Sequence, residues 1–294
     1  MQLTISGLSK TYSNGVKALN NLSLTIGTGM FGLLGPNGAG KSSLMRTIAT
    51  LQEPDSGSIQ LGDLDVLKQK DEVRRLLGYL PQEFGVYPKL PATDLLDHLA
   101  VLKGITNRGE RRDLCDHLLK QTNLWDHRKK NLGTYSGGMK QRFGIAQALL
   151  GSPKLIIVDE PTAGLDPTER NRFLNLLSSI GENVIIILST HIVDDVRELC
   201  SRMAIVNKGE VLIEGPPQDA LDRLTGQMWK RTLANGELAH YQQTMNVVST
   251  HLVGGRTQIR VHSDAAPEPD FAAVEPDLED VYFLALKAHE ARKQ

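Results

Sequence analysis

The spacing of apolar residues separates two kinds of strand in the first part of the chain. Residues 3–5 and 22–26 alternate between apolar and polar side chains, which is typical of antiparallel strands with one face in solvent. Residues 30–34, 155–158 and 184–188 are continuously apolar, as in parallel strands that are buried on both faces. Because helical stretches separate these strands, the pattern predicts an α/β fold, with an antiparallel β subdomain beside a mostly parallel core sheet.

A long stretch between two of these strands has helical spacing instead. No convincing strand pattern occurs between residues 91 and 150. Leucines recur there on two helical faces, Leu95, Leu96, Leu99 and Leu102 on one and Leu114, Leu118 and Leu119 on the other. We therefore predict an inserted helical subdomain at about residues 83–150, within a domain formed by residues 1–215.

The chain changes character beyond that domain. Strand-like pieces occur at residues 247–248 and 258–261, and Gly254 and Gly255 predict a turn between them. These features predict a small α+β extension over residues 216–294.

An acidic stretch precedes the last predicted helix of this extension. Residues 263–280 contain three prolines, seven acidic residues and no Lys or Arg. That composition favours a solvated loop. It leads to a predicted helix at about residues 278–287.

A phosphate-binding loop follows the first buried strand. Residues 35–42 read GPNGAGKS, which matches G-x-x-x-x-G-K-[ST] between a strand and a helix predicted at 43–49. The glycines let main-chain N–H groups approach phosphate oxygens, and the helix N-terminus adds a partial positive charge. We expect Lys41 to neutralise the β- and γ-phosphates of ATP and the Ser42 hydroxyl to bind Mg²⁺. The candidate ATP-binding residues of this segment are Gly35, Asn37, Gly38, Gly40, Lys41, Ser42 and Ser43.

Two carboxylates, Asp159 and Glu160, follow the second buried strand. At the carboxyl end of a parallel strand they share an edge of the sheet with the phosphate loop. We expect Asp159 to hold Mg²⁺, directly or through water, and Glu160 to act as the general base on the attacking water. Gln82 and His191 also follow apolar strands, but this position alone favours an ordinary loop residue for Gln82 and a solvated histidine for His191.

Residues 135–142 read YSGGMKQR and resemble the signature motif of ABC-type ATPases. The other motifs of that family occur in the family order, namely Tyr12, the phosphate loop, Gln82, the signature, Asp159 with Glu160, the segment 164–166 and His191. On this resemblance, residues 1–215 are similar to one ABC nucleotide-binding domain, an ABC-type P-loop NTPase. The extension resembles that of bacterial drug and antibiotic exporter ATPases, notably in residues 278–284, LEDVYFL.

The resemblance implies roles for single residues on the nucleotide side of the site. Tyr12 would stack on adenine, and Gln82 would sense Mg²⁺ and the attacking water. His191 would contact the γ-phosphate. Asp166 would belong to the loop that communicates with the opposite ATP site.

The signature implies a second copy of the chain. Ser136 is a good N-cap, so the helix that follows it offers N–H groups to an anion. In the family, Ser136, Gly137 and Gly138 would bind the ATP held by the phosphate loop of a second copy, in a head-to-tail dimer. Met139 replaces the usual signature glutamine and lacks the amide that would contact the ribose, and Tyr135 replaces the usual leucine.

The resemblance further implies a separate transmembrane permease subunit. The helical insert and the segment 83–88 would grip a helix of that subunit, with Phe84, Val86 and Tyr87 as apolar contacts; packing in the local core is the alternative. The chain would then lie in the cytoplasm, peripheral on the cytoplasmic face of the cell membrane, as part of an exporter.

Composition limits the remaining function classes. A net charge of −1 gives no electrostatic drive towards nucleic acid, so no nucleic-acid partner is expected. The two cysteines, Cys115 and Cys200, cannot form a disulfide framework, and the histidines show no metal-ligand spacing. No secretory signal and no apolar run of about 20 residues occurs. Membrane association is therefore expected through a partner.

Two other hypotheses are weighed against a transport ATPase. One is a non-transport ABC ATPase acting in DNA repair, translation or cofactor assembly, but the long coiled coils, zinc cysteines or paired ATPase halves usual in repair and translation forms do not occur. The other is a binding or regulatory module without turnover, which the presence of Glu160 and His191 disfavours.

Overall fold

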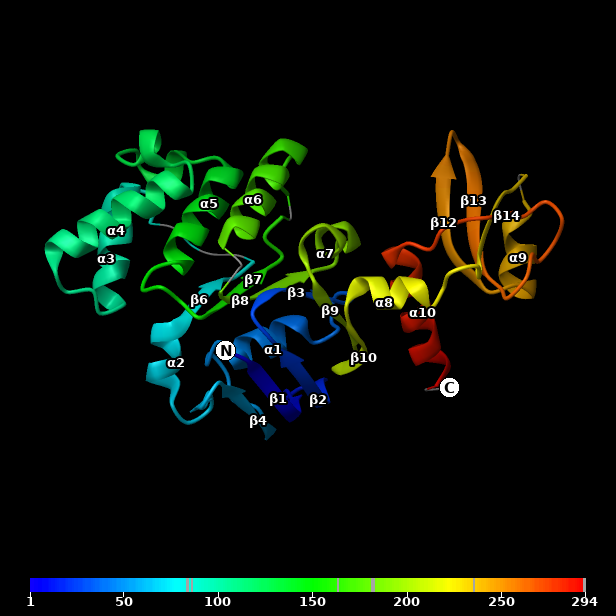
Figure 1. Ribbon diagram of the computed structural model, residues 1–294, viewed down its shortest axis with the longest axis horizontal. Coiled ribbons are helices and arrows are strands. Elements are labelled where there is room, and N and C mark those ends of the chain that lie inside the picture. Colours follow the sequence, from blue (N-terminus) through cyan, green and yellow to red (C-terminus); the bar gives the residue numbers. More distant parts are fainter. Residues whose placement is uncertain (83–84, 86, 163, 181–182, 235, 293–294) are drawn as a thin grey trace. The chain divides into compact units, whose positions relative to one another are not determined.

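The structure is a computed structural model that describes residues 1–82, 85, 87–162, 164–180, 183–234 and 236–292 (Figure 1). These residues form two compact units, Met1–Val211 and Leu212–Gln294. In the part of the chain that is described, no helix is long and apolar enough to cross a membrane.

The first unit begins with the predicted antiparallel sheet. Its strands are β1 (Leu3–Thr11), β2 (Lys17–Ile26), β4 (Ser56–Leu61) and β5 (Leu64–Asp65), in the order β2-β1-β4-β5. β1 is antiparallel to both neighbours. Alternate side chains are buried at residues 3–5 of β1 and 22–26 of β2, as the alternation of apolar and polar residues predicted.

A six-stranded sheet forms the core of the first unit, in the order β10-β9-β3-β8-β7-β6. Its strands are β3 (Gly29–Leu34), β6 (Leu77–Leu80), β7 (Leu155–Asp159), β8 (Ile185–Thr190), β9 (Arg202–Asn207) and β10 (Glu210–Gly215), of which Glu210 and Val211 belong to the first unit. The pairs β9–β3, β3–β8, β8–β7 and β7–β6 are all parallel. The carboxyl ends of β3, β8, β7 and β6 therefore meet at one edge, which brings together four segments that are far apart in the sequence.

Four described helices of the first unit, outside the helical subdomain, follow strands of its two sheets. They are α1 (Lys41–Ile48), α2 (Lys70–Leu76), α6 (Pro167–Ile180) and α7 (Val193–Leu199). α1 begins two residues before the predicted start. Such shifts of one or two residues are within the ordinary uncertainty of a helix end.

The helical subdomain contains α3 (Ala92–Leu102), α4 (Arg108–Gln121) and α5 (Gly137–Ala148). Figure 1 shows these helices gathered on one side of the core sheet. The described residues from 91 to 150 form no strand beyond one isolated bridge, which confirms the predicted helical character. Leu95, Leu96, Leu118 and Leu119 pack in the core of the subdomain. Leu102 has the same leucine spacing, but it is the last residue of α3 and is 71% exposed, so it does not belong to this core.

The second unit has its own sheet, in the order β12-β13-β11-β14. Its elements are α8 (Pro217–Asp222), β11 (Met228–Thr232), α9 (Leu238–Thr244), β12 (Val247–Val253), β13 (Arg256–His262), β14 (Ala272–Ala273) and α10 (Leu278–Ala291). β12 and β13 form the predicted hairpin, and Gly254 and Gly255 take the left-handed φ values that its turn requires, 57° and 78°.

The prediction of a solvated loop over residues 263–280 was wrong in part. Phe271 is buried against the Tyr241 ring, and β14 pairs with β11. Glu268 accepts hydrogen bonds from Arg231 and from the Tyr241 hydroxyl. Acidic composition suggested solvent, but basic and aromatic partners that lie elsewhere in the sequence fold part of the segment onto the unit.

Candidate active site

A cavity of about 380 Å³ lies over the phosphate loop at the edge where the parallel strands end. Its described lining residues come from the antiparallel sheet, the loop and α1, and two strand ends: Tyr12, Val16, Ala18, Pro36, Asn37, Gly38, Ala39, Gly40, Lys41, Ser42, Ser43, Gln82 and Glu160. The structure thus gathers nine of the residues singled out in the sequence around one space. Val16 and Ala18 also line it, and nothing in their sequence context pointed to them.

Two glycines of the phosphate loop are required by close packing. Gly40 precedes α1 with a φ of 106°, and a Cβ built on it would lie 2.3 Å from the Ala18 carbonyl oxygen. A Cβ on Gly35 would lie 2.3 Å from the Val206 carbonyl oxygen. Without side chains at these positions, the loop main chain can follow the tight path that turns its N–H groups towards an anion.

The Lys41 side chain is buried at the floor of this cavity, with 5% of its surface exposed. Its Nζ donates to the main-chain oxygens of Gly35 (2.5 Å) and Pro36 (3.3 Å) and lies 3.9 Å from Glu160 Oε1. Burial lowers the pKa of Lys41, and the carboxylates of Glu160 and Asp159 oppose that effect. The ammonium is thus held where a phosphate oxygen, a stronger acceptor than a carbonyl, would be charge-stabilised.

Asp159 offers a carboxylate suited to Mg²⁺. It is the last residue of β7, and burial raises the pKa of its carboxyl group. Ser42 and Ser189 lie close enough to stabilise the charge, but no hydrogen bond of normal geometry reaches Asp159 Oδ1 from any described residue. A buried oxygen without a partner, beside the Ser42 hydroxyl, fits a hard cation.

The described residues contain no group of three or more His, Cys, Asp or Glu side chains that could enclose a metal ion. Mg²⁺ usually keeps several waters and is bound by one or two protein ligands together with substrate phosphates.

Glu160 is the point on which the catalytic candidates converge. Gln82 Nε2 donates to Glu160 Oε2 at 3.2 Å, and His191 Nδ1 lies 3.3 Å from the same oxygen. Lys41 approaches the other oxygen. Gln82 follows β6, Glu160 follows β7 and His191 follows β8, so the parallel register of these strands makes the meeting possible.

The main chain at Glu160 is strained. Its φ is 46°, in the left-handed region that a residue with a side chain rarely adopts. Its N–H donates to the Ser189 carbonyl at 2.9 Å, which ties the turn to the end of β8. Strain of this kind persists only where surrounding contacts enforce it, and it is concentrated at functional sites. The sequence carries no sign of it.

Tyr12 reaches the start of α1 from the end of β1. Its hydroxyl is 2.9 Å from Ser43 Oγ and donates to Gln52 Oε1 at 3.1 Å. The ring therefore lies at the side of the cavity with its hydroxyl end fixed.

The signature residues lie elsewhere on the same unit. Ser136 is the N-cap of α5, and its Oγ accepts from the Met139 N–H at 3.2 Å, as predicted for a cap. Ser136 and Gly137 are exposed, and neither is among the described lining residues of the phosphate-loop cavity. The Met139 side chain packs on the helical core, and Tyr135 is buried in it.

The remaining predicted residues, Gly138 and Asp166, both lie next to Glu169 of α6. A Cβ on Gly138 would lie 2.3 Å from Glu169 Oε2, so a side chain at this position would require the Glu169 carboxylate to move. Glu169 in turn pairs with Arg142 of α5. Asp166 Oδ1 accepts from the Glu169 N–H at 2.9 Å and so caps the first turn of α6.

A buried carboxylate next to the site, that of Asp195, escaped the sequence analysis. Asp195 lies in the first turn of α7 and has no exposed surface. It accepts hydrogen bonds from Thr162, Arg170 and Thr190. Two consecutive aspartates at a helix start look like ordinary solvent-exposed helix-dipole partners, so the sequence offered no signal for burial.

Comparison with known proteins agrees with this geometry. A profile of the family described as "ABC transporter" matches residues 19–163. The probable multidrug ABC transporter ATP-binding protein YbhF of Escherichia coli (strain K12) is 33% identical over 302 residues, which cover 97% of this chain and 52% of YbhF. The chain thus spans about half the length of that relative.

One further relative and one solved structure cover more of their own length. The daunorubicin/doxorubicin resistance ATP-binding protein DrrA of Streptomyces peucetius is 31% identical over 282 residues, covering 95% of this chain and 83% of DrrA. The dimeric post-hydrolysis structure of the ATP-binding cassette MJ0796 bound to ADP and Pi matches with a TM-score of 0.66 and 28% identity, over 73% of this chain and 98% of that one. The chain therefore belongs to the ABC transporter ATP-binding family, a family of P-loop ATPases.

Proposed function

We propose that this chain binds MgATP over its phosphate loop, hydrolyses it at Glu160 and uses the energy to drive a separate transmembrane subunit. The observation that carries the proposal is the convergence of Gln82, His191 and Lys41 on Glu160 beside the phosphate-loop cavity. Such an arrangement of a carboxylate, an amide, an imidazole and a cation suits in-line attack of water on a terminal phosphate, where positioning and charge stabilisation do most of the work.

Each side chain has a distinct task in this proposal. Glu160 accepts the proton of the attacking water, and Gln82 orients that water. His191 donates a hydrogen bond to the γ-phosphate. Lys41 leaves its carbonyl partners for the β- and γ-phosphate oxygens, and Tyr12 places its ring against adenine.

Ser42, Asp159 and Gln82 would hold Mg²⁺, which supplies charge neutralisation of the β- and γ-phosphates when bound. The main-chain N–H groups of the loop bind the phosphates from the other side. These donors include the N–H groups of Asn37, Gly38, Gly40 and Ser43.

A second copy of the chain would complete the site. Ser136 and Gly137 present the exposed N-terminus of α5, away from the phosphate-loop cavity of their own chain. In a head-to-tail dimer this helix start, with Gly138, would bind the γ-phosphate held by the partner's loop, since N–H groups and the helix dipole both favour an anion there. Asp166 at the start of α6 would report the state of one site to the other.

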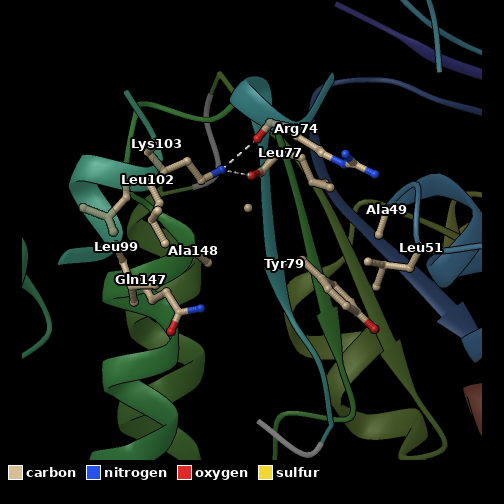
Figure 2. Close-up of a pocket in the computed structure, with 12 residues that line it drawn as sticks. Ala49, Leu51, Arg74, Leu77, Tyr79, Leu99, Leu102, Lys103, Gln147 and Ala148 are labelled. Carbon is tan, nitrogen blue, oxygen red and sulfur yellow. Dashed lines mark hydrogen bonds between the residues drawn. The ribbon is translucent and has the colours of Figure 1, made fainter. Parts of the chain in front are cut away.

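A groove between the core and the helical subdomain supports a membrane partner. It has a volume of about 340 Å³ (Figure 2). Figure 2 shows Leu99, Leu102 and Lys103 of the helical subdomain facing Leu77 and Tyr79 of the core. Leu102 at one rim and Leu51 at the other are 71% and 62% exposed, so apolar side chains that a partner could cover flank the groove.

The chemistry of the groove indicates what it would bind. Lys103 Nζ donates to the carbonyl oxygens of Arg74 (2.9 Å) and Leu77 (2.5 Å), drawn as dashed lines in Figure 2. Arg74 and Lys103 are its charged lining residues, and no described lining residue is acidic. An apolar helix segment carrying a carboxylate matches these walls. We infer that a cytoplasmic helix of the transmembrane subunit docks here.

Exposure of the Tyr87 side chain decides between the two alternatives for this residue. Phe84 and Val86, named with it as contacts, lie outside the described residues. Tyr87 is 66% exposed, so packing in the local core is excluded for its side chain, and a contact with a partner stays a proposal.

Replacing Leu102 by Glu is expected to break the partnership and spare the ATPase of the isolated chain. A carboxylate at the apolar rim would have to be desolvated by the incoming helix. The tagged parent should copurify with one integral membrane protein in constant ratio from solubilised membranes, and the Leu102→Glu variant should lose it.

Leu252→Glu is the matched control, because Leu252 is similarly exposed (78%) but lies on β12 of the second unit. Phosphate release from MgATP by each purified chain should match the parent. Retention of the membrane protein by Leu102→Glu would contradict the assigned groove.

The names of YbhF and DrrA support an exporter of drug-like or antibiotic compounds. In that case the chain lies in the cytoplasm, on the cytoplasmic face of the cell membrane, with residues 1–215 as the ATP-driven domain. Residues 216–294 would be an accessory part, with its own core, that supports regulation or dimer formation.

A further inference from the structure

The buried carboxylate of Asp195 joins three segments around the active site. Its Oδ1 accepts from Arg170 Nε at 2.8 Å, and Arg170 Nη2 lies 2.5 Å from the same oxygen. Its Oδ2 accepts from Thr162 Oγ1 at 2.7 Å and from Thr190 Oγ1 at 3.3 Å. Oδ1 therefore forms the ion pair with Arg170, and Oδ2 accepts hydrogen bonds from the two threonine hydroxyl groups.

The two threonines flank the residues assigned to catalysis. Thr162 comes two residues after Glu160, and Thr190 immediately precedes His191. Both hydroxyl groups are buried. Thr190 Oγ1 also accepts from the Ile192 N–H at 2.9 Å, so the chain on both sides of His191 is held at the same hydroxyl.

The strained turn at Glu160 must be restrained by contacts of the neighbouring residues. Its left-handed φ of 46° is fixed on one side by the strand end, where the Glu160 N–H donates to Ser189. On the other side, the next side-chain hydrogen bond among the described residues is that of Thr162 to Asp195. A residue in a sparsely populated conformation persists only where the surrounding structure over-determines it, and these two hydrogen bonds restrain the chain before and after Glu160.

We propose that Asp195 is a positioning residue for ATP hydrolysis, which holds Thr162 and Thr190 together and so keeps Glu160 and His191 in contact. This inference rests on the proposed function. Asp195 touches neither substrate nor water in it, and acts only through the two threonines. Arg170 of α6 supplies the counter-charge that lets the carboxylate remain buried.

Isosteric substitution of the threonines tests this role without burying an unpaired charge. Thr162→Val and Thr190→Val each keep the shape of the side chain and the Asp195–Arg170 pair, but remove one hydrogen bond to Oδ2; Thr190→Val also removes the acceptor of the Ile192 N–H. We expect each to lower kcat for ATP by about tenfold or more, because small misplacements of catalytic groups cost up to about a hundredfold. The dissociation constant for a fluorescent ATP analogue should not change. Thr162→Ser and Thr190→Ser restore the hydroxyl and should return kcat to within about twofold of the parent.

Thr122→Val is the matched control, because Thr122 is fully buried and its hydroxyl donates to the Leu118 carbonyl at 2.8 Å, in the helical subdomain. Its kcat should equal that of the parent. Unchanged kcat in the Val variants at positions 162 and 190, equal losses in the Val and Ser variants, or an equal loss in Thr122→Val would overturn the inference. A parent chain that binds ATP but releases no phosphate would overturn the proposed function itself, so the two failures are distinguishable.

Discussion

Replacing Glu160 by Gln should lower ATP turnover by roughly a hundred- to ten-thousandfold, the usual range for losing a general base. Gln keeps the size of the side chain and can still accept the hydrogen bond from Gln82, so the site should remain assembled. Nucleotide should still bind, since the phosphate loop is untouched. Phosphate release under single-turnover conditions, with ATP binding measured in parallel by fluorescence, separates the two effects.

Glu53→Gln gives the control for loss of a carboxylate. Glu53 pairs with Lys70 on the surface of the same unit, and an exposed pair contributes little to stability. Its turnover should match that of the parent. A Glu160→Gln variant that hydrolyses ATP at the parent rate would show that another group accepts the proton.

Lys41→Ala should weaken ATP binding by at least about thirtyfold, because truncating one partner of a buried charge pair typically costs about 2 kcal/mol or more. The ammonium is buried, and its present partners are the loop carbonyls and Glu160, so no water layer screens it from an incoming phosphate. Titration with a fluorescent ATP analogue measures the loss directly.

The exposed Lys154 provides the comparison. It precedes β7, at the opposite end of the strand that finishes at Asp159. Lys154→Ala removes the same charge from the chain and should bind nucleotide like the parent. Equal affinity of the Lys41→Ala variant would mean that the phosphates do not reach this loop.

The sequence was most informative where one local pattern determines the structure. Continuous apolar runs identified β3, β7 and β8, because strands buried on both faces are apolar over most of their length. The Gly-Lys-Ser pattern located a loop whose glycines are demanded by contacts with Ala18 and Val206. The N-cap role of Ser136 depends on the next three residues only, and it too was predictable.

Structural features that depend on contacts with other segments could not be predicted from the local sequence pattern. Leu102 fits the leucine spacing of α3 but ends the helix at the rim of a groove. The segment around Phe271 folds onto its unit through Arg231 and Tyr241, which lie 30 or more residues away. Asp195 is buried because hydroxyl and guanidinium groups from three other segments meet there.

The candidate site shows the same division. The positions of the strand ends predicted which residues share an edge of the sheet. The contact of Gln82 and His191 with one Glu160 oxygen depends on the register of β6, β7 and β8, which the sequence did not predict. The family resemblance supplied their roles. The left-handed turn at Glu160 had no counterpart in any sequence pattern.

Mixing two inactive variants tests most directly whether the ATP site is shared between copies. Ser136→Arg removes the N-cap and blocks the N-terminus of α5, but keeps the phosphate loop and Glu160; Glu160→Gln keeps the Ser136 cap but lacks the base. Each alone should be nearly inactive. In a mixed dimer, the Ser136→Arg loop faces an intact helix cap from the other chain, so one of the two sites is whole.

Phosphate release is the measurement, after purified monomers are combined in equal amounts before MgATP is added. Half of the dimers would be mixed with one working site each, which predicts recovery of about a quarter of the parent activity for a two-fold symmetric dimer. Activity that stays at the level of the separate variants would contradict a site built from two chains.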